Sequence, residues 1–176
     1  FIEFSAQGLK KKKYYKLEEK IDENKDNEPL SFKYYISELK RRIFTSFNEH
    51  TQFDVDGGIH LSSGSDSVVL AALTNLTNKK LNTYTFDYEH EQFSEVADAK
   101  KIALAANIEN KTSTLLDSKL QENIFKVIET QYEPFSSLRI LCQNDLYEKF
   151  KHESKVILDG SGGDELGAGY RYYLIP

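Results

Sequence analysis

Apolar residues along the chain follow two spacings, one typical of helices and one typical of strands. Between Phe32 and Phe47 they recur three or four positions apart, which predicts a helix with Ser31 as its N-cap. The same spacing predicts further helices over 66–77, 94–107, 117–128 and 136–151. Short runs rich in β-branched, aromatic and aliphatic residues predict strands over 57–61, 82–88, 110–116 and 155–159.

The order of these elements indicates the fold class. Along the chain we expect helix, strand, helix, strand, helix, strand, two helices and a final strand. Strands connected by helical crossovers pair in parallel, and a parallel sheet needs helices over both faces. The sequence therefore predicts an α/β fold with an open, mostly parallel sheet and helices on both faces.

Two of the predicted helices have apolar faces that supply candidate core positions. In helix 94–107, with Ser94 as the expected cap, these positions are Val96, Ala99, Ile102, Ala103 and Ala106. In the helix after Asp117 they are Leu120, Ile124, Val127 and Ile128, all expected to point inward.

The first 28 residues have a different character. Lys10 to Lys13 precede a strongly acidic stretch, so we expect residues 1–28 to form a solvated connector and residues 29–176 to form the globular domain. The chain contains no Met and stops within the apolar, aromatic stretch YRYYLIP. We therefore expect a fragment whose globular domain is truncated at its C-terminus.

Composition narrows the classes of function. The chain is 39% hydrophobic and 29% charged, which is typical of a globular protein, and its net charge of −5 argues against nucleic acid as the main partner. No apolar run approaches the roughly 20 residues that a membrane span requires. The single cysteine, Cys142, excludes an intrachain disulfide, favours a cytoplasmic location and is expected to be a small buried hydrophobe.

A patch of small polar residues separates strand 57–61 from the helix that follows it: Ser62, Ser63, Gly64, Ser65, Asp66 and Ser67. A helix N-terminus attracts anions, the glycine permits close approach of the backbone, and the hydroxyl groups add hydrogen-bond donors. These properties suit a phosphate or a pyrophosphate. A cluster of N-cap residues that binds nothing has the same composition, so both interpretations stay open at this point.

A second loop, Gly160–Glu165, follows strand 155–159 and combines three glycines with two acids. The carboxylate of Asp66 repels a phosphate unless a cation lies between them, and one Mg²⁺ held by Asp66 and Asp164 explains the acids in both loops. Ligands of open parallel sheets bind beyond the carboxyl ends of the strands. If both strands are central, the two loops face each other across one crevice.

These loops resemble the signatures of a known family. LSSGSDS is similar to the S-G-G-x-D-S loop of the PP-loop ATP pyrophosphatases, which belong to the HUP-like folds. KVILDGSGGDELGAGYRYY resembles the second signature of the asparagine synthetases, and FIEFSAQGLKKKKYYKL resembles the connector after their glutaminase domain. The resemblance extends over nearly the whole chain.

The resemblance implies an ATP-dependent ligase. Such an enzyme adenylates the side chain of aspartate, releases pyrophosphate and transfers ammonia, which gives asparagine and AMP. It implies ATP and Mg²⁺ as cofactors and a glutaminase domain or subunit as the ammonia source, and a homodimer is left open. It also implies that Ser62, Ser63, Gly64 and Ser67 hold the pyrophosphate, with Asp66 and Asp164 as catalytic metal ligands.

Further roles are implied by position in the family pattern. Leu61 and Phe86 would line the adenosine site, and Asp159 and Gly160 would lie beside the ribose and the α-phosphate. Glu165 would orient the loop, and we expect His60 to have a core or supporting role. Ser161 is a candidate catalytic residue that stands where the family usually has Glu, and Ser63 replaces the first Gly of S-G-G-x-D-S.

The departure at Ser161 leaves two alternatives to an asparagine synthetase. One is a related ligase with another acyl substrate, which closes a lactam or amidates a peptide or a sugar. The other is a non-catalytic nucleotide-binding subunit.

Overall fold

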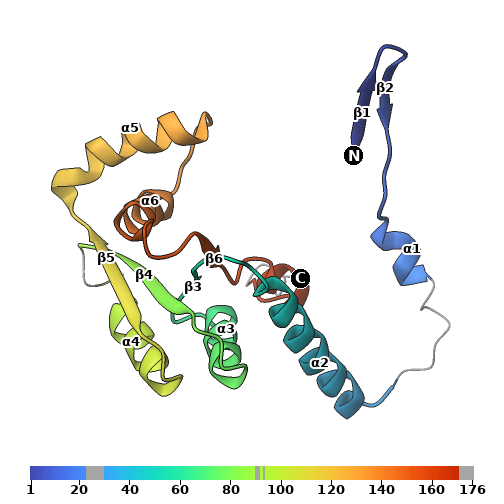
Figure 1. The fold of residues 1–176 in the computed structure, drawn as a ribbon, viewed down its shortest axis with the longest axis horizontal. Coiled ribbons are helices and arrows are strands. Elements are labelled where there is room, and N and C mark those ends of the chain that lie inside the picture. The colour runs from blue at the N-terminus through green and yellow to red at the C-terminus, as the bar shows by residue number, and fades with distance from the viewer. Residues whose placement is uncertain (23–29, 90–91, 93, 171–176) are drawn as a thin grey trace. The chain divides into compact units, whose positions relative to one another are not determined.

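The computed structural model describes all residues except 23–29, 90–91, 93 and 171–176, and the chain divides into two compact units, 1–41 and 42–176 (Figure 1). The predicted boundary between residues 28 and 29 lies outside the described residues. No helix in the described part of the chain is long and apolar enough to cross a membrane.

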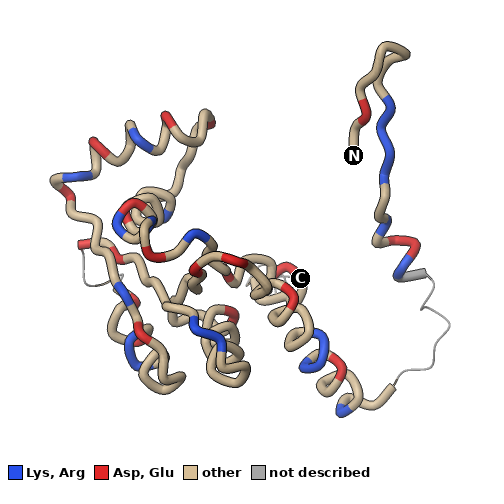
Figure 2. The backbone as a smooth tube through the Cα atoms, viewed as in Figure 1, with Lys and Arg blue, Asp and Glu red and all other residues tan. Residues whose placement is uncertain are grey.

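The first unit contains a hairpin that the sequence analysis missed. Strands β1 (Ile2–Ser5) and β2 (Gly8–Lys11) pair antiparallel, and helix α1 (Leu17–Asp22) follows them. Gly8 has a φ of +114°, a backbone conformation that residues with a side chain rarely adopt. A glycine at this position therefore permits the tight turn. The lysine run that begins in β2, blue in Figure 2, indicated a solvated connector, while the alternation of Ile2 and Phe4 in β1 is the signal that favours a strand.

The second unit is built around a four-stranded parallel sheet in the order β5-β4-β3-β6. Its strands are β3 (Gly57–His60), β4 (Asn82–Tyr88), β5 (Asn110–Leu115) and β6 (Val156–Leu158). The predicted α/β class, the parallel pairing and the four strand positions are confirmed. Successive strands proceed from β3 to β4 to β5, and β6 then returns to the other side of β3. The strand order therefore reverses between β3 and β6.

Helices cover both faces of this sheet (Figure 1). Helices α3 (Ser65–Leu76) and α4 (Val96–Ala105) cover one face, where Leu61 packs with Ala71 and with the predicted alanines of α4. Helix α6 (Leu138–Phe150) covers the other face, with α5 (Leu120–Gln131) packed on it after the short 3-10 helix η2 (Asp117–Lys119).

Helix α2 (Phe32–His50) crosses the boundary between the two units. Its N-cap prediction is confirmed, because the Ser31 hydroxyl accepts a hydrogen bond from the amide of Tyr34 at 3.2 Å. At its other end Phe47 packs with Ile59, Leu73 and Leu81.

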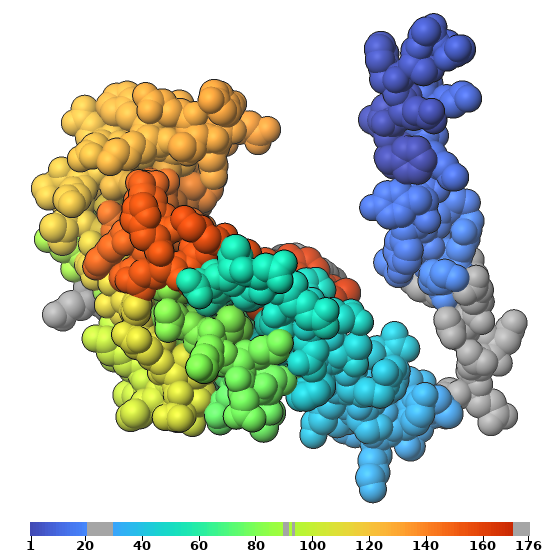
Figure 3. Space-filling model, viewed as in Figure 1, coloured from blue at the N-terminus to red at the C-terminus, as the bar shows by residue number. Residues whose placement is uncertain are grey.

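Two sequence-based expectations about side chains and caps are wrong. Ile124 and Ile128 do not point into the core, because they are 37% and 48% exposed on α5, which lies at the molecular surface in Figure 3. The N-cap position of α4 is Glu95 and not Ser94, although the Ser94 hydroxyl accepts from the amide of Val96 at 3.4 Å while it donates to Asp87 at 3.0 Å. The condition that both loop-bearing strands are central is not met, because β6 is an edge strand among the described strands.

Candidate active site

The loops after β3 and β6 meet at the carboxyl edge of the sheet, at the point where the strand order reverses. Because β6 pairs directly with β3 in parallel, the two strands deliver their following loops to the same edge. A crevice of about 300 Å³ lies between them. Eight of the eleven predicted site residues line it: Ser62, Gly64, Asp66, Ser67, Asp159, Gly160, Ser161 and Asp164. The expected crevice is therefore confirmed, although β6 lies at an edge.

The two loops touch through glycine. A Cβ atom added to Gly160 would lie only 2.9 Å from Cβ of Asp66 and 3.2 Å from the amide nitrogen of Ser67. A Cβ atom added to Gly163 would overlap the Asp66 carboxylate. The glycines thus allow the second loop to rest directly on the first turn of α3. This close fit brings the carboxylate of Asp66 to the loop that carries Asp164.

The serine patch is held by hydrogen bonds among its own residues, and these bonds do not cap the start of α3. The hydroxyl of Ser67 donates to the carbonyl oxygens of Ser62 and Gly64 at 3.0 and 2.9 Å, and it accepts from the amide of Ser62 at 3.1 Å. In the described structure no side chain caps α3 at Gly64. The first amide groups of the helix therefore stay available to an anion, which argues against a patch that serves only as a cap.

We expect Ser67→Ala to destabilise the domain by about 1–3 kcal/mol, because it leaves the Ser62 amide without its acceptor in a partly buried loop. Denaturant unfolding measures this change. Ser65→Ala is the matched control, since Ser65 is exposed and, among the described residues, its hydroxyl donates only to Asp66. Equal stability of the two variants would contradict a structural role for Ser67.

Two acids in the crevice are candidates for a metal. Asp66 and Asp164 both line it, and among the described residues no cluster of three or more His, Cys, Asp or Glu side chains could hold an ion. Mg²⁺ takes one or two carboxylates and completes its shell with phosphate oxygens and water. The pair therefore fits a magnesium ion that a bound nucleotide helps to hold.

Three predicted residues lie elsewhere. Leu61 is fully buried, with its amide donating to Tyr84 and its carbonyl accepting from Thr85, both at 2.8 Å. The hydroxyl of Ser63 donates to Glu95 at 2.9 Å. Phe86 lines an adjoining pocket with Asp87 and Glu95. The structure thus places Phe86 in a pocket that shares residues with the crevice, and Leu61 in the core, where it packs with Ala71.

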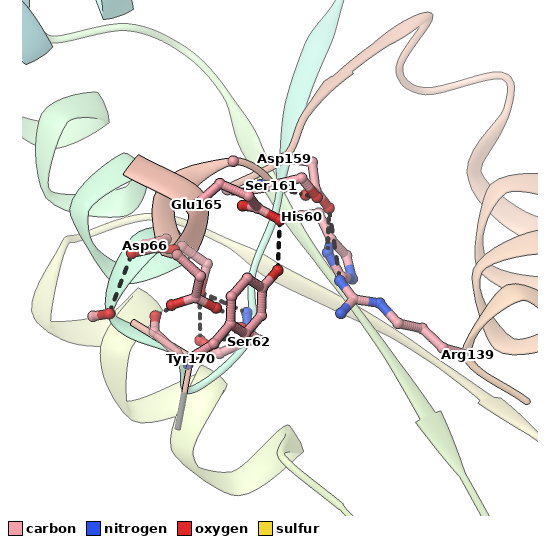
Figure 4. A pocket seen from close by; sticks show the side chains of 14 residues that line it. His60, Ser62, Asp66, Arg139, Asp159, Ser161, Glu165 and Tyr170 are labelled. Carbon is pink, nitrogen blue, oxygen red and sulfur yellow. Dashed lines mark hydrogen bonds and ion pairs between the residues drawn. The ribbon is translucent and has the colours of Figure 1, made fainter. Parts of the chain in front are cut away.

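The carboxylate of Asp159 makes several contacts that fix the start of the second loop. One carboxylate oxygen accepts from the amide of Ser161 at 2.7 Å and from its hydroxyl. The other lies 3.0 Å from Nδ1 of His60 and 4.0 Å from the guanidinium of Arg139 (Figure 4). Burial raises the pKa of Asp159, but these hydrogen bonds and charges outweigh burial and leave that pKa below its usual range. Asp159 is therefore ionised at neutral pH.

Sequence reasoning missed Arg139 and Tyr170. Arg139 lies in the first turn of α6, lines both the crevice and the adjoining pocket, and sits 5.7 Å from the centre of the Phe86 ring. The topology could have indicated Arg139, because a helix that leads into a parallel strand begins at the carboxyl edge of the sheet. The hydroxyl of Tyr170 donates to Glu165 at 2.6 Å, and Glu165 thus contacts the chain that follows its loop.

The fold and the two facing loops define an α/β protein with a crevice at the carboxyl edge of a parallel sheet. The asparagine synthase family model matches residues 38–176, and the chain belongs to this family. It is 29% identical over 141 residues to the glutamine-hydrolysing asparagine synthetase 1 of Bacillus subtilis strain 168, a match that covers 80% of this chain. The chain spans about a fifth of the length of the curated relatives that it matches, 22% in that case.

A solved structure supports the fold independently. The NH3-dependent NAD synthetase of Campylobacter jejuni, in complex with the nitrate ion, is 17% identical with a TM-score of 0.51. The match covers 76% of this chain and 60% of that one. At this level of identity the likeness supports the α/β fold alone.

Proposed function

We propose that this chain forms the ATP-binding part of an amide-forming ligase that adenylates a carboxylate with release of pyrophosphate and transfers ammonia to the acyl group. Aspartate is the proposed acid, and asparagine and AMP are the proposed products. The main observation that supports this proposal is the crevice that lies where the strand order reverses. This crevice brings the uncapped start of α3 together with Asp66, Asp164 and Arg139.

The proposed roles of the residues follow from their charges. The amides at the start of α3, with Ser62, Gly64 and Ser67, would bind the pyrophosphate, and the guanidinium of Arg139 would supply a positive charge for the α-phosphate or the acid, because all of these groups line the crevice. Asp66 and Asp164 would hold Mg²⁺, which neutralises charge on the leaving pyrophosphate when it is bound. Catalysis by this chain then consists of positioning and charge stabilisation.

The remaining roles are further parts of this proposal. Phe86 lines the pocket that would take the adenosine, and Leu61 would lie at the same site. Ser63, whose hydroxyl donates to Glu95, would add to the pyrophosphate site. Asp159 and Gly160 shape the loop beside the ribose and the α-phosphate. The Bacillus relative is named as glutamine-hydrolysing, which supports a glutaminase domain or subunit as the ammonia source. A cytoplasmic location and a homodimer remain proposals.

One observation keeps a different acyl substrate as the second candidate. Ser161 has no carboxylate, and its hydroxyl is already committed to Asp159. It therefore does not replace the family Glu in handling aspartate. A related ligase that closes a lactam or amidates a peptide or a sugar would use the same adenylation chemistry.

Pyrophosphate release from Mg·ATP in the presence of aspartate and ammonium, followed by mass spectrometry, tests the proposal. Pyrophosphate, AMP and asparagine in equal amounts are the expected result. Release that depends on another carboxylic acid would favour the second candidate. Binding of ATP without turnover of any acid would indicate a non-catalytic nucleotide-binding subunit and overturn the proposal.

A further inference from the structure

The contact between His60 and Asp159 requires a proton on Nδ1 of the imidazole. Nδ1 lies 3.0 Å from an oxygen of Asp159, and an ionised carboxylate can only accept, so the imidazole must donate there. Burial lowers the pKa of His60, and the nearby Asp159 opposes that shift only in part. The ring is therefore neutral at pH 7. A neutral imidazole with its hydrogen on Nδ1 has a free lone pair on Nε2.

The structure leaves that lone pair facing open space. His60 lines both the crevice and the adjoining pocket. Among the described residues its hydrogen bonds involve Nδ1 alone, and Nε2 is not among the buried side-chain atoms that lack a partner. Nε2 thus remains accessible from the cavity, although the side chain as a whole is only 5% exposed.

The ring is held firmly in this orientation. It stacks on Phe86 with the ring centres 4.8 Å apart and the planes 16° from parallel. Asp159 is in turn fixed by Ser161 and approached by Arg139, so neither partner of the pair rotates freely (Figure 4). A carboxylate that orients an imidazole, with the far nitrogen aimed at substrate, is the arrangement in which histidine acts as a general base.

We propose that His60 is the catalytic base of the amide-forming step, a role that rests on the proposed function. Ammonia attacks the carbonyl carbon of the acyl-adenylate, so a C–N bond forms, the C–O bond to AMP breaks, and AMP leaves with the electron pair. One proton passes from the attacking nitrogen to Nε2 of His60 and then to water. The charge of Asp159 stabilises the imidazolium that forms.

Other groups in the crevice suit this step less well. Asp66 and Asp164 are the candidate metal ligands, and Glu165 accepts a hydrogen bond from Tyr170. A serine hydroxyl such as that of Ser161 is far too weak a base at neutral pH. Among the described residues that line the crevice, His60 supplies the imidazole, the side chain whose basicity matches neutral pH.

The first test separates adenylation from amide formation. His60→Asn places an amide nitrogen where Nδ1 donates to Asp159 but removes Nε2. We expect this variant of the full chain to keep aspartate-dependent exchange of pyrophosphate into ATP and to lose amide formation from ammonium by about 10²–10⁴-fold. His60→Gln, which removes the base in a longer side chain, should behave alike, whereas the exposed His152→Asn should match the unaltered chain.

Equal loss of exchange and amide formation in both variants would show a structural role and overturn the proposal, as would full amide formation in either. The pH profile adds a second criterion. Three charged groups act on His60 from different elements, namely Asp159, Arg139 and Glu95. The rate of amide formation by the unaltered chain should fall as the pH drops through the pKa of His60, which lies below the ordinary value of 6.5. The two His60 variants should not show this fall at low pH.

A spectroscopic test remains decisive even if the unaltered chain shows no pyrophosphate exchange, which would be a failure of the proposed function itself. Nitrogen-15 NMR of the full chain, with His60 assigned through His60→Asn, should show a protonated Nδ1 and an unprotonated Nε2 at pH 7.5. A proton on Nε2, or an imidazolium at that pH, would overturn the assignment of His60 as a base.

Discussion

Replacing Asp66 with Asn is expected to lower magnesium-dependent pyrophosphate release by about 10³-fold or more while the fold stays intact. The carboxylate of Asp66 is one of the two candidate metal ligands in the crevice, and it rests on the glycine loop that carries the other, Asp164. A metal at a developing charge contributes several kcal/mol, and each 1.36 kcal/mol changes a rate by about tenfold. The amide of Asn keeps the size of the side chain but is a poor ligand for Mg²⁺.

The measurement is the rate of pyrophosphate release as a function of magnesium concentration, with circular dichroism as the check on folding. Asp98→Asn is the matched control, because Asp98 is an exposed acid on α4 that pairs with Lys101 at 2.8 Å, away from the crevice. An unchanged rate and an unchanged magnesium dependence for Asp66→Asn would exclude the metal role. A similar loss in Asp98→Asn would mean that the effect is one of net charge.

Much of the fold could be predicted because the relevant signals are local. The apolar runs of β3 and β6 and the alanine face of α4 each lie within about ten consecutive residues, and the structure places them as expected. The meeting of the two loops was also predictable, because parallel strands that flank a reversal of strand order present their carboxyl ends together. The ligand-binding roles of the individual residues remain predictions.

What could not be predicted depends on contacts between distant segments. Arg139 reaches Asp159 from another element, and His60 and Asp159 are 99 residues apart in sequence. No local pattern marks such a pair. The prediction that Ile124 and Ile128 point inward was wrong for a related reason. Helical spacing identifies an apolar face of a helix, but it cannot show whether the rest of the described chain covers that face. The catalytic role of Ser161 stays a prediction, and the hydrogen bond from its hydroxyl to Asp159 is a contact that no local pattern marks.

The second large effect is expected from Gly160→Ala, which should separate the two loops and disable the crevice. The added methyl group would lie 2.9 Å from Cβ of Asp66 and 3.2 Å from both the Asp66 carbonyl carbon and the Ser67 amide nitrogen. Those atoms belong to the first turn of α3, so they cannot rotate away as the tip of a side chain can. Overpacking of this kind costs about 1–3 kcal/mol of stability, and a shift of about 1 Å at a reacting group costs about 10²-fold in rate.

Gly167→Ala provides the matched control for this prediction, because a Cβ atom at Gly167 meets nothing within 4 Å in the described structure and the residue closes α7 (Gly163–Gly167). Denaturant unfolding and ATP binding of both variants make the comparison. We expect Gly160→Ala to lose stability and ATP affinity together and Gly167→Ala to keep both. If Gly160→Ala bound Mg·ATP normally, the tight contact between the second loop and α3 would not be needed for the nucleotide. The site would then be formed by the serine loop alone, and the second loop would have to act later, on the acid or on ammonia.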